Sequence, residues 1–85
     1  MMTNGSDGEK LNRLIIAVAD GHADCLDGIY ALAGGKMYAV AVSVVGRDYA
    51  EDVLHESFIK IARLAKKYSW SENPCGWLIK IVRTA

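Results

Sequence analysis

Hydrophobic residues recur every three to four positions through most of the chain, which is the spacing of amphipathic helices. The first series follows a capping-box sequence at Ser6 to Glu9, and it predicts a helix that ends at about Ala19. A second series begins at Leu26 and predicts a helix that stops at Gly34-Gly35, because two consecutive glycines make continuation costly. Residues 1–7 are expected to be disordered.

The next segment, MYAVAVSVV from Met37 to Val45, fits two kinds of element. Its larger residues alternate with smaller ones, which on a strict count is a strand pattern. However, the chain offers no second convincing strand, and a lone strand leaves its backbone hydrogen-bonding groups unpaired. We therefore predict a helix here, and an all-α bundle of four to five helices in one domain spanning residues 1–85.

The segment DYAEDVLHESFIKIARLAKKY, residues 48–68, has the strongest helical periodicity in the chain. Asp48 is its predicted N-cap, with Glu51 three residues further on. An apolar arc is predicted to face the core and contains Ala50, Val53, Leu54, Phe58, Ile61, Leu64, Ala65 and Tyr68. The opposite arc contains Asp52, His55, Glu56, Ile59, Ala62 and Arg63. This second arc is either a solvated face or a face that binds a partner.

A short polar loop, SWSEN, separates this helix from a final one. Asn73 as N-cap and Pro74 at the first helical position form a paired start signal. The apolar stripe that follows is predicted to face the core and consists of Trp77, Leu78, Ile81, Val82 and Ala85, with Lys80 and Arg83 outside it.

Charge is distributed unevenly, although the formal net charge is zero. Residues 1–59 carry nine acidic and four basic residues, a net charge of −5, whereas residues 60–85 carry one acidic and six basic residues, a net charge of +5. This asymmetry indicates one surface for a basic partner and another for an acidic partner, with nucleic acid among the candidates.

Neither cysteine chemistry nor apolar runs point to an exported or membrane protein. Cys25 and Cys75 are isolated, which is typical of a reduced cytosolic protein. The longest apolar run, Met37 to Val45, has nine residues, against the roughly 20 of a membrane helix. The start, MMTNGSDGEK, does not resemble a signal peptide. We expect a cytoplasmic protein with no membrane span.

The sequence also argues against an enzyme. No nucleophile and base are placed together, and Gly34-Gly35 lacks the flanking pattern of a phosphate-binding loop. His22 and Cys25 are i, i+3 neighbours that could join His55 and Cys75 in a zinc site, but no usual ligand spacing follows. We predict no catalytic residues, no cofactor and no metal.

The segment at residues 48–68 resembles the second conserved region of bacterial RNA polymerase sigma factors, especially the extracytoplasmic-function (ECF) group, whose members carry an AED-V-x-QE-x-F pattern there. The preceding ADGHADCLDGIYALAGGKMYAVAVSVVGRDYAED resembles the earlier helices of that domain. NPCGWLIKIVRTA resembles its loop and the start of its promoter-reading helix. The resemblance covers about residues 11–85, and the blocks AEDVLHESF and GWLIKIVR carry it. It implies an all-helical bundle.

In that family, the helix that matches residues 48–68 docks on the coiled-coil clamp helices of the polymerase beta-prime subunit. The positions that carry over are Asp52, His55, Glu56, Ile59 and Ala62. Asp52 and Glu56 would meet arginines of the clamp in charge-assisted hydrogen bonds, while Ile59 and Ala62 would supply the apolar centre. His55 replaces the family's usual glutamine, and imidazole donates and accepts one hydrogen bond each with a different reach.

The resemblance also implies a surface for promoter DNA, since the family opens the minus-ten element and captures a flipped base of the non-template strand. The positions implied for DNA are Lys66, Lys67, Trp70, Asn73, Lys80, Arg83 and Thr84. Lys66 and Lys67 would contact phosphates. Trp70 either stacks on a base or closes the loop over the core. Trp77 lies on the apolar stripe and is assigned to the core.

Nothing in the sequence resembles the family's fourth region, and the promoter-reading helix stops after about three turns. We therefore expect an isolated or truncated second-region domain that binds the RNA polymerase core and recognises and melts the minus-ten promoter element. The alternative is a helical protein-interaction module with a sigma-like fold that does not bind DNA. An anti-sigma protein is a further partner in this family, but nothing in these residues identifies one.

Overall fold

The computed structural model describes residues 3–85, with side chains from residue 7 onward. These residues form four α-helices and one short 3-10 helix: α1 Thr3–Ala19, α2 Cys25–Val45, α3 Arg47–Leu64, η1 Ala65–Lys67 and α4 Pro74–Thr84. The part of the chain that is described contains no strand. The prediction of a small all-α bundle is confirmed.

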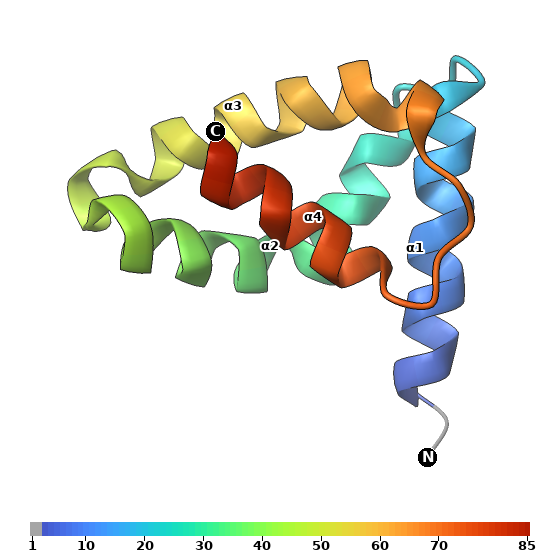
Figure 1. Ribbon diagram of the computed structural model, residues 1–85, viewed down its shortest axis with the longest axis horizontal. Coiled ribbons are helices and arrows are strands. Elements are labelled where there is room, and N and C mark those ends of the chain that lie inside the picture. The colour runs from blue at the N-terminus through green and yellow to red at the C-terminus, as the bar shows by residue number, and fades with distance from the viewer. Residues whose placement is uncertain (1–2) are drawn as a thin grey trace.

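The long helix α2 is the central element and packs against α1, α3 and α4 (Figure 1). It packs most extensively on α3, which runs beside it in the opposite direction. α4 lies against both of these helices, and α1 stands across their ends, where it also contacts η1. The bundle is flattened, with extents of 32 × 32 × 18 Å.

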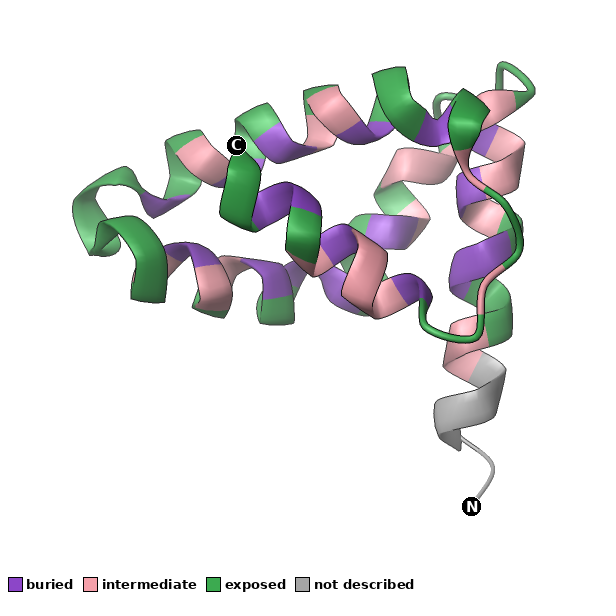
Figure 2. Cartoon of the chain, in the orientation of Figure 1, coloured by how far each residue is buried: buried purple, intermediate pink, exposed green. Residues whose placement is uncertain are grey.

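The core consists of apolar side chains contributed by every element (Figure 2). Its largest fully buried members are Ile15 of α1, Ile29 and Met37 of α2, Ile61 of α3, and Leu78 and Val82 of α4. The apolar stripe predicted for the last helix is buried at Leu78, Ile81 and Val82 and half-buried at Trp77. It is wrong at Ala85, which is exposed because α4 ends at Thr84.

The predicted stop at Gly34-Gly35 is wrong, because α2 continues through both glycines as one helix of 21 residues. The helical prediction for MYAVAVSVV is confirmed, but this segment continues α2 and is not a helix of its own. Residues buried on both sides of the glycine pair, including Ala33 and Met37, explain the continuation. Burial of such side chains outweighs the cost of about 1 kcal/mol that each mid-helix glycine imposes.

The two glycines of α2 provide a matched test of this account. Gly35 is exposed, and a Cβ built there meets no atom within 4 Å, so Gly35→Ala is expected to raise the free energy of unfolding by about 0.5 to 1 kcal/mol. Gly34 is buried, and a Cβ there would lie 2.8 Å from the Tyr30 ring. Gly34→Ala should therefore show a smaller gain or a loss. Urea denaturation measures both, and equal effects of the two variants would contradict the packing described here.

Two predicted helix starts are also corrected. α1 begins at Thr3, so the start predicted at Ser6 is wrong. The helix includes residues 3–7, residues 1 and 2 lie outside the described residues, and the expected disorder of residues 1–7 stays a prediction. Asp48 is not the N-cap of α3, because Gly46 occupies that position and α3 begins at Arg47. Gly46 has a φ of 85° and donates its N–H to the Val42 carbonyl, closing α2 at the corner where α3 begins.

Among the described residues, α2 is the helix long and apolar enough to cross a membrane, judged by length and composition alone. The core helix of a soluble protein satisfies the same test. In this bundle, α2 buries Ile29, Ala33, Gly34, Met37 and Ala41. Within the bundle, 28% of the apolar window of α2 is buried, and the expectation of no membrane span stays a prediction.

Candidate functional site

The side of α3 that points away from the bundle is exposed along its whole length (Figure 2). All six residues of the predicted outward arc are exposed, and we call them the outer face of α3: Asp52, His55, Glu56, Ile59, Ala62 and Arg63. Ile59 is 41% exposed, although it lies two residues from Ile61, which is fully buried. The outer face is therefore an exposed surface with two carboxylates, one guanidinium and an isoleucine among them, on a helix whose opposite side packs in the core.

The inward side of α3 differs from the prediction at two residues. Leu64 is 37% exposed, so its assignment to the core is wrong. Ser57 is fully buried and was missed because a serine is rarely expected inside. Its hydroxyl donates to the Val53 carbonyl at 2.7 Å, which satisfies the buried polar group within the helix. The position of Ser57, four residues before Ile61, was the available signal.

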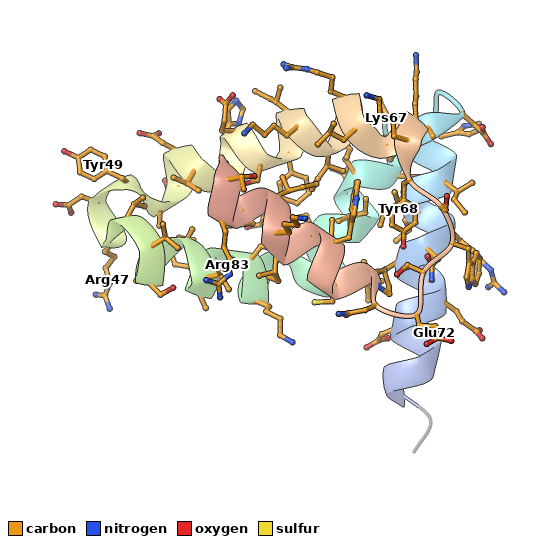
Figure 3. The ribbon with its side chains drawn as sticks, in the orientation of Figure 1. Arg47, Tyr49, Lys67, Tyr68, Glu72 and Arg83 are labelled. Atoms are coloured by element: carbon orange, nitrogen blue, oxygen red, sulfur yellow. The ribbon has the colours of Figure 1, made fainter. Side chains whose placement is uncertain are left out.

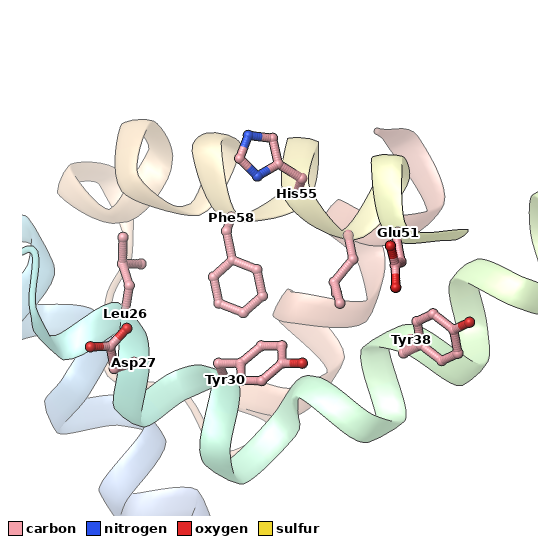
Figure 4. A pocket seen from close by; sticks show the side chains of 8 residues that line it. Leu26, Asp27, Tyr30, Tyr38, Glu51, His55 and Phe58 are labelled. Carbon is pink, nitrogen blue, oxygen red and sulfur yellow. The ribbon is translucent and has the colours of Figure 1, made fainter. Parts of the chain in front are cut away.

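A groove of about 610 Å³ lies between α2 and α3, beside the outer face (Figure 4). Phe58 points from α3 toward Tyr30 of α2, and their ring centroids are 5.8 Å apart. Asp27 and Glu51 bring a carboxylate from each helix, and His55 lines the groove while also belonging to the outer face. Tyr30 is 58% exposed. The groove thus joins aromatic surface to acidic side chains, a combination that suits an apolar or cationic side chain of a partner.

The loop between η1 and α4 is held by one buried side chain, Asn12 of α1. Its amide donates to the Ser71 carbonyl at 2.8 Å and to the Gly8 carbonyl at 3.2 Å. Its oxygen accepts from the Ser71 N–H at 3.0 Å and from the Tyr68 hydroxyl. Asn12 therefore uses both ends of its amide to position the loop. Nothing in the sequence pattern signalled this, because an asparagine in a helix usually lies on the solvated side.

Tyr68 and Trp77 pack against the core, whereas Trp70 is exposed to solvent. Burial raises the pKa of the Tyr68 hydroxyl above its ordinary value of 10.0, and the Ser71 side chain partly offsets this rise in pKa. The Tyr68 ring meets Trp77 edge-on, with centroids 4.7 Å apart, so Trp77 packs against the core as predicted. Trp70 is 55% exposed and does not close the loop over the core.

The predicted DNA-binding residues are all exposed but do not form one cluster. Lys66, Lys67 and Trp70 lie on η1 and the loop, whereas Lys80, Arg83 and Thr84 lie on α4. Figure 3 shows Lys67 and Arg83 well apart, with Arg83 on the side of α4 that adjoins α2.

Several polar groups at the two ends of α4 are already engaged within the fold. The Asn73 side-chain oxygen accepts from the Gly76 N–H at 3.0 Å, which confirms Asn73 as N-cap and Pro74 as the first helical residue. The Thr84 hydroxyl donates to the Lys80 carbonyl at 3.1 Å. The Lys60 amine donates to the Thr84 carbonyl at 2.8 Å and ties α3 to the end of α4. Asn73 and Thr84 are therefore less available to a ligand than the cations between them.

Lys36 of α2 lines the same hollow as Lys80 and Arg83, although the sequence offered no reason to assign it to a binding surface. These three basic residues line a second hollow, of about 340 Å³, between α2 and α4. Lys36 is more than 40 positions from Lys80 in the sequence, so only the packing of α4 on α2 could show that they meet.

The residues with metal-ligating side chains are dispersed. Within the described part of the chain, no group of three or more His, Cys, Asp or Glu residues could hold a metal ion. Cys25 and Cys75 are free thiols in the structure.

No protein-family model, curated protein or solved structure matches the chain. The features of this chain that bear on function are therefore its AEDVLHESF and GWLIKIVR motifs and the surfaces that the fold presents.

Proposed function

We propose that this chain is a sigma-type second-region domain that binds the clamp helices of the RNA polymerase beta-prime subunit and recognises the minus-ten promoter element. The observation that carries the proposal is the outer face of α3, where Ile59 is 41% exposed between Asp52, Glu56 and Arg63 on a helix anchored by buried Ile61. A small apolar centre within a charged surface is typical of a protein interface. Its location would be the cytoplasm, where the polymerase works.

The proposed contacts follow from the chemistry of the outer face. Asp52 and Glu56 are one helical turn apart, so they can receive two arginines of a neighbouring helix in charge-assisted hydrogen bonds. Two like charges at this spacing repel each other by a few tenths of a kcal/mol, and a cationic partner relieves that repulsion. Ile59 and Ala62 lie one turn further along and supply apolar contact. His55 replaces the family's glutamine at the edge of the groove between α2 and α3.

The basic surface supports the second half of the proposal. Lys66, Lys67 and Trp70 are exposed on η1 and the loop that follows it, and Lys80 and Arg83 are exposed further along the chain on α4. An exposed aromatic side chain that follows two lysines in the sequence suits a single strand, whose bases stack and whose phosphates attract positive charge. Asn73 and Thr84 contribute less, because their side chains are engaged within the fold.

The test is binding of the chain to a purified fragment that carries the beta-prime clamp helices. We expect Asp52→Ala and Glu56→Ala each to weaken binding by about 1 to 3 kcal/mol, because each removes a charge-assisted bond. Glu9→Ala, an exposed carboxylate on α1, is the matched control and should bind like the unaltered chain. Isothermal calorimetry measures all three. Unchanged affinity in both Asp52→Ala and Glu56→Ala would remove the proposed face.

A second measurement separates the proposal from its alternative. The chain bound to polymerase core is expected to prefer a single-stranded minus-ten oligonucleotide over a scrambled one of the same length and composition. Clamp binding without any such preference would instead support a helical interaction module that does not bind promoter DNA. Fluorescence anisotropy of labelled oligonucleotides at a fixed salt concentration gives the comparison.

A further inference from the structure

The hollow between α2 and α4 gathers positive charge from two helices that are distant in the sequence. Lys36 approaches from α2, and Lys80 and Arg83 approach from α4, around a volume of about 340 Å³. The described residues that line this hollow include no Asp or Glu, whereas an adjoining hollow that shares Lys36 is also lined by Asp7 and Glu72. All three basic residues are exposed at its rim. The surface of the hollow is mostly apolar, so its positive charge comes from these three exposed side chains.

The first turn of α4 also lines this hollow, and its Gly76 N–H is already bonded to the Asn73 side chain. Asn73, Cys75 and Gly76 line the same hollow, and they stand at the N-terminal end of an 11-residue helix, where the helix dipole is positive. A Cβ at Gly76 would clash with the Asn73 side chain, so glycine at this position leaves room for the cap.

We infer that this hollow binds a phosphate group, with Lys36 as a phosphate ligand beside Lys80 and Arg83. A guanidinium matches the geometry of phosphate oxygens with paired donors, and lysines serve phosphate as compact point charges. The partly buried Ile79 and Cys75 give the hollow an apolar wall, which suits a phosphate carried on a sugar. The inference goes beyond the proposed function, because Lys36 lies on α2 and the site requires no promoter sequence.

The phosphate group can come from the backbone of a single-stranded nucleic acid or from free inorganic phosphate. Two titrations of the ¹⁵N-labelled chain, followed by amide chemical shifts, distinguish these sources. One titration uses inorganic phosphate, and the other uses a short oligonucleotide that contains only thymidine. We expect either probe to shift the amides of Lys36, Gly76 and Arg83. Saturation by inorganic phosphate would assign a free phosphate, and saturation by the oligonucleotide alone would assign the nucleic-acid backbone. The absence of shifts at these amides with both probes would overturn the inference.

A charge-matched pair of variants tests the role of Lys36 itself. Lys36→Gln and Lys10→Gln each remove one exposed lysine, but Lys10 lies on α1, outside the hollow. The plot of log affinity against log salt concentration has a negative slope. If Lys36 contacts a phosphate, Lys36→Gln makes this slope shallower by about 0.7 for a single-stranded oligonucleotide, whereas Lys10→Gln leaves it unchanged. Equal slopes for the two variants would overturn the assignment. Clamp-helix binding through the outer face of α3 is a separate measurement, so failure here leaves that proposal standing.

Discussion

Replacing Ile61 by alanine is expected to lower the free energy of unfolding by about 2 to 5 kcal/mol, because the variant leaves a cavity in the core. Ile61 is fully buried and joins the packing of α3 on the bundle. The same substitution at Ile59, two residues earlier, is expected to cost about 0.5 kcal/mol or less, since its side chain is 41% exposed on the outer face. One helix therefore carries two isoleucines with opposite roles.

The two isoleucine variants should reverse their order when binding is measured. Ile59→Ala is expected to weaken binding to the beta-prime clamp helices, because it removes the apolar centre of the proposed contact. Ile61→Ala is expected to bind normally once the fraction of folded chain is taken into account. Urea denaturation and calorimetry on the same preparations give both quantities. Clamp binding that is unaffected by Ile59→Ala would show that the isoleucine is only a solvated surface residue.

Replacing Asn12 by alanine is expected to cost about 2 to 4 kcal/mol of unfolding free energy. The reason is the number of groups that depend on this one amide. The variant would leave the Ser71 N–H, the Ser71 carbonyl and the Tyr68 hydroxyl without the partner that each has in the structure. Each partly buried group that loses its hydrogen bond costs about 1 to 3 kcal/mol, and water recovers part of that cost in an exposed loop.

Two further variants test whether the effect of Asn12→Ala comes from its hydrogen bonds. Arg13→Ala changes the exposed neighbour on the same helix and is expected to alter stability by less than about 0.5 kcal/mol. Tyr68→Phe removes only one of the hydrogen bonds to Asn12 and should fall between the two. Thermal unfolding followed by circular dichroism ranks the three variants. If Asn12→Ala resembled Arg13→Ala, the hydrogen bonds would have no net effect on stability.

The sequence was sufficient to predict the helical class and which side of α3 is buried, because both depend on the spacing of apolar residues. The six residues of the outer face were predicted from periodicity and all are exposed. Periodicity failed where a long-range contact outweighed a local preference. The break at Gly34-Gly35 did not occur, because burial on both sides of the pair maintains α2.

The two features that the sequence could not predict both depend on the packing of distant segments. Asn12 looked like an ordinary polar residue of an amphipathic helix, but its partners Tyr68 and Ser71 lie 56 and 59 positions further along the chain. Lys36 belongs to the acidic half of the chain by sequence, yet it joins the cations of α4. Neither contact has a local pattern, so only the packing of the elements brings these residues together.

The single residue Gly46 between α2 and α3 has a consequence for the order in which the protein folds. Two helices that are adjacent in sequence and joined by so short a corner meet without closing a long loop. The contacts of Asn12 with the loop, in contrast, can form only after nearly the whole chain has come together. We therefore expect the α2–α3 hairpin to assemble early and the segment from Tyr68 to α4 to settle last. A newly made chain would present the outer face of α3 before the hollow between α2 and α4 exists.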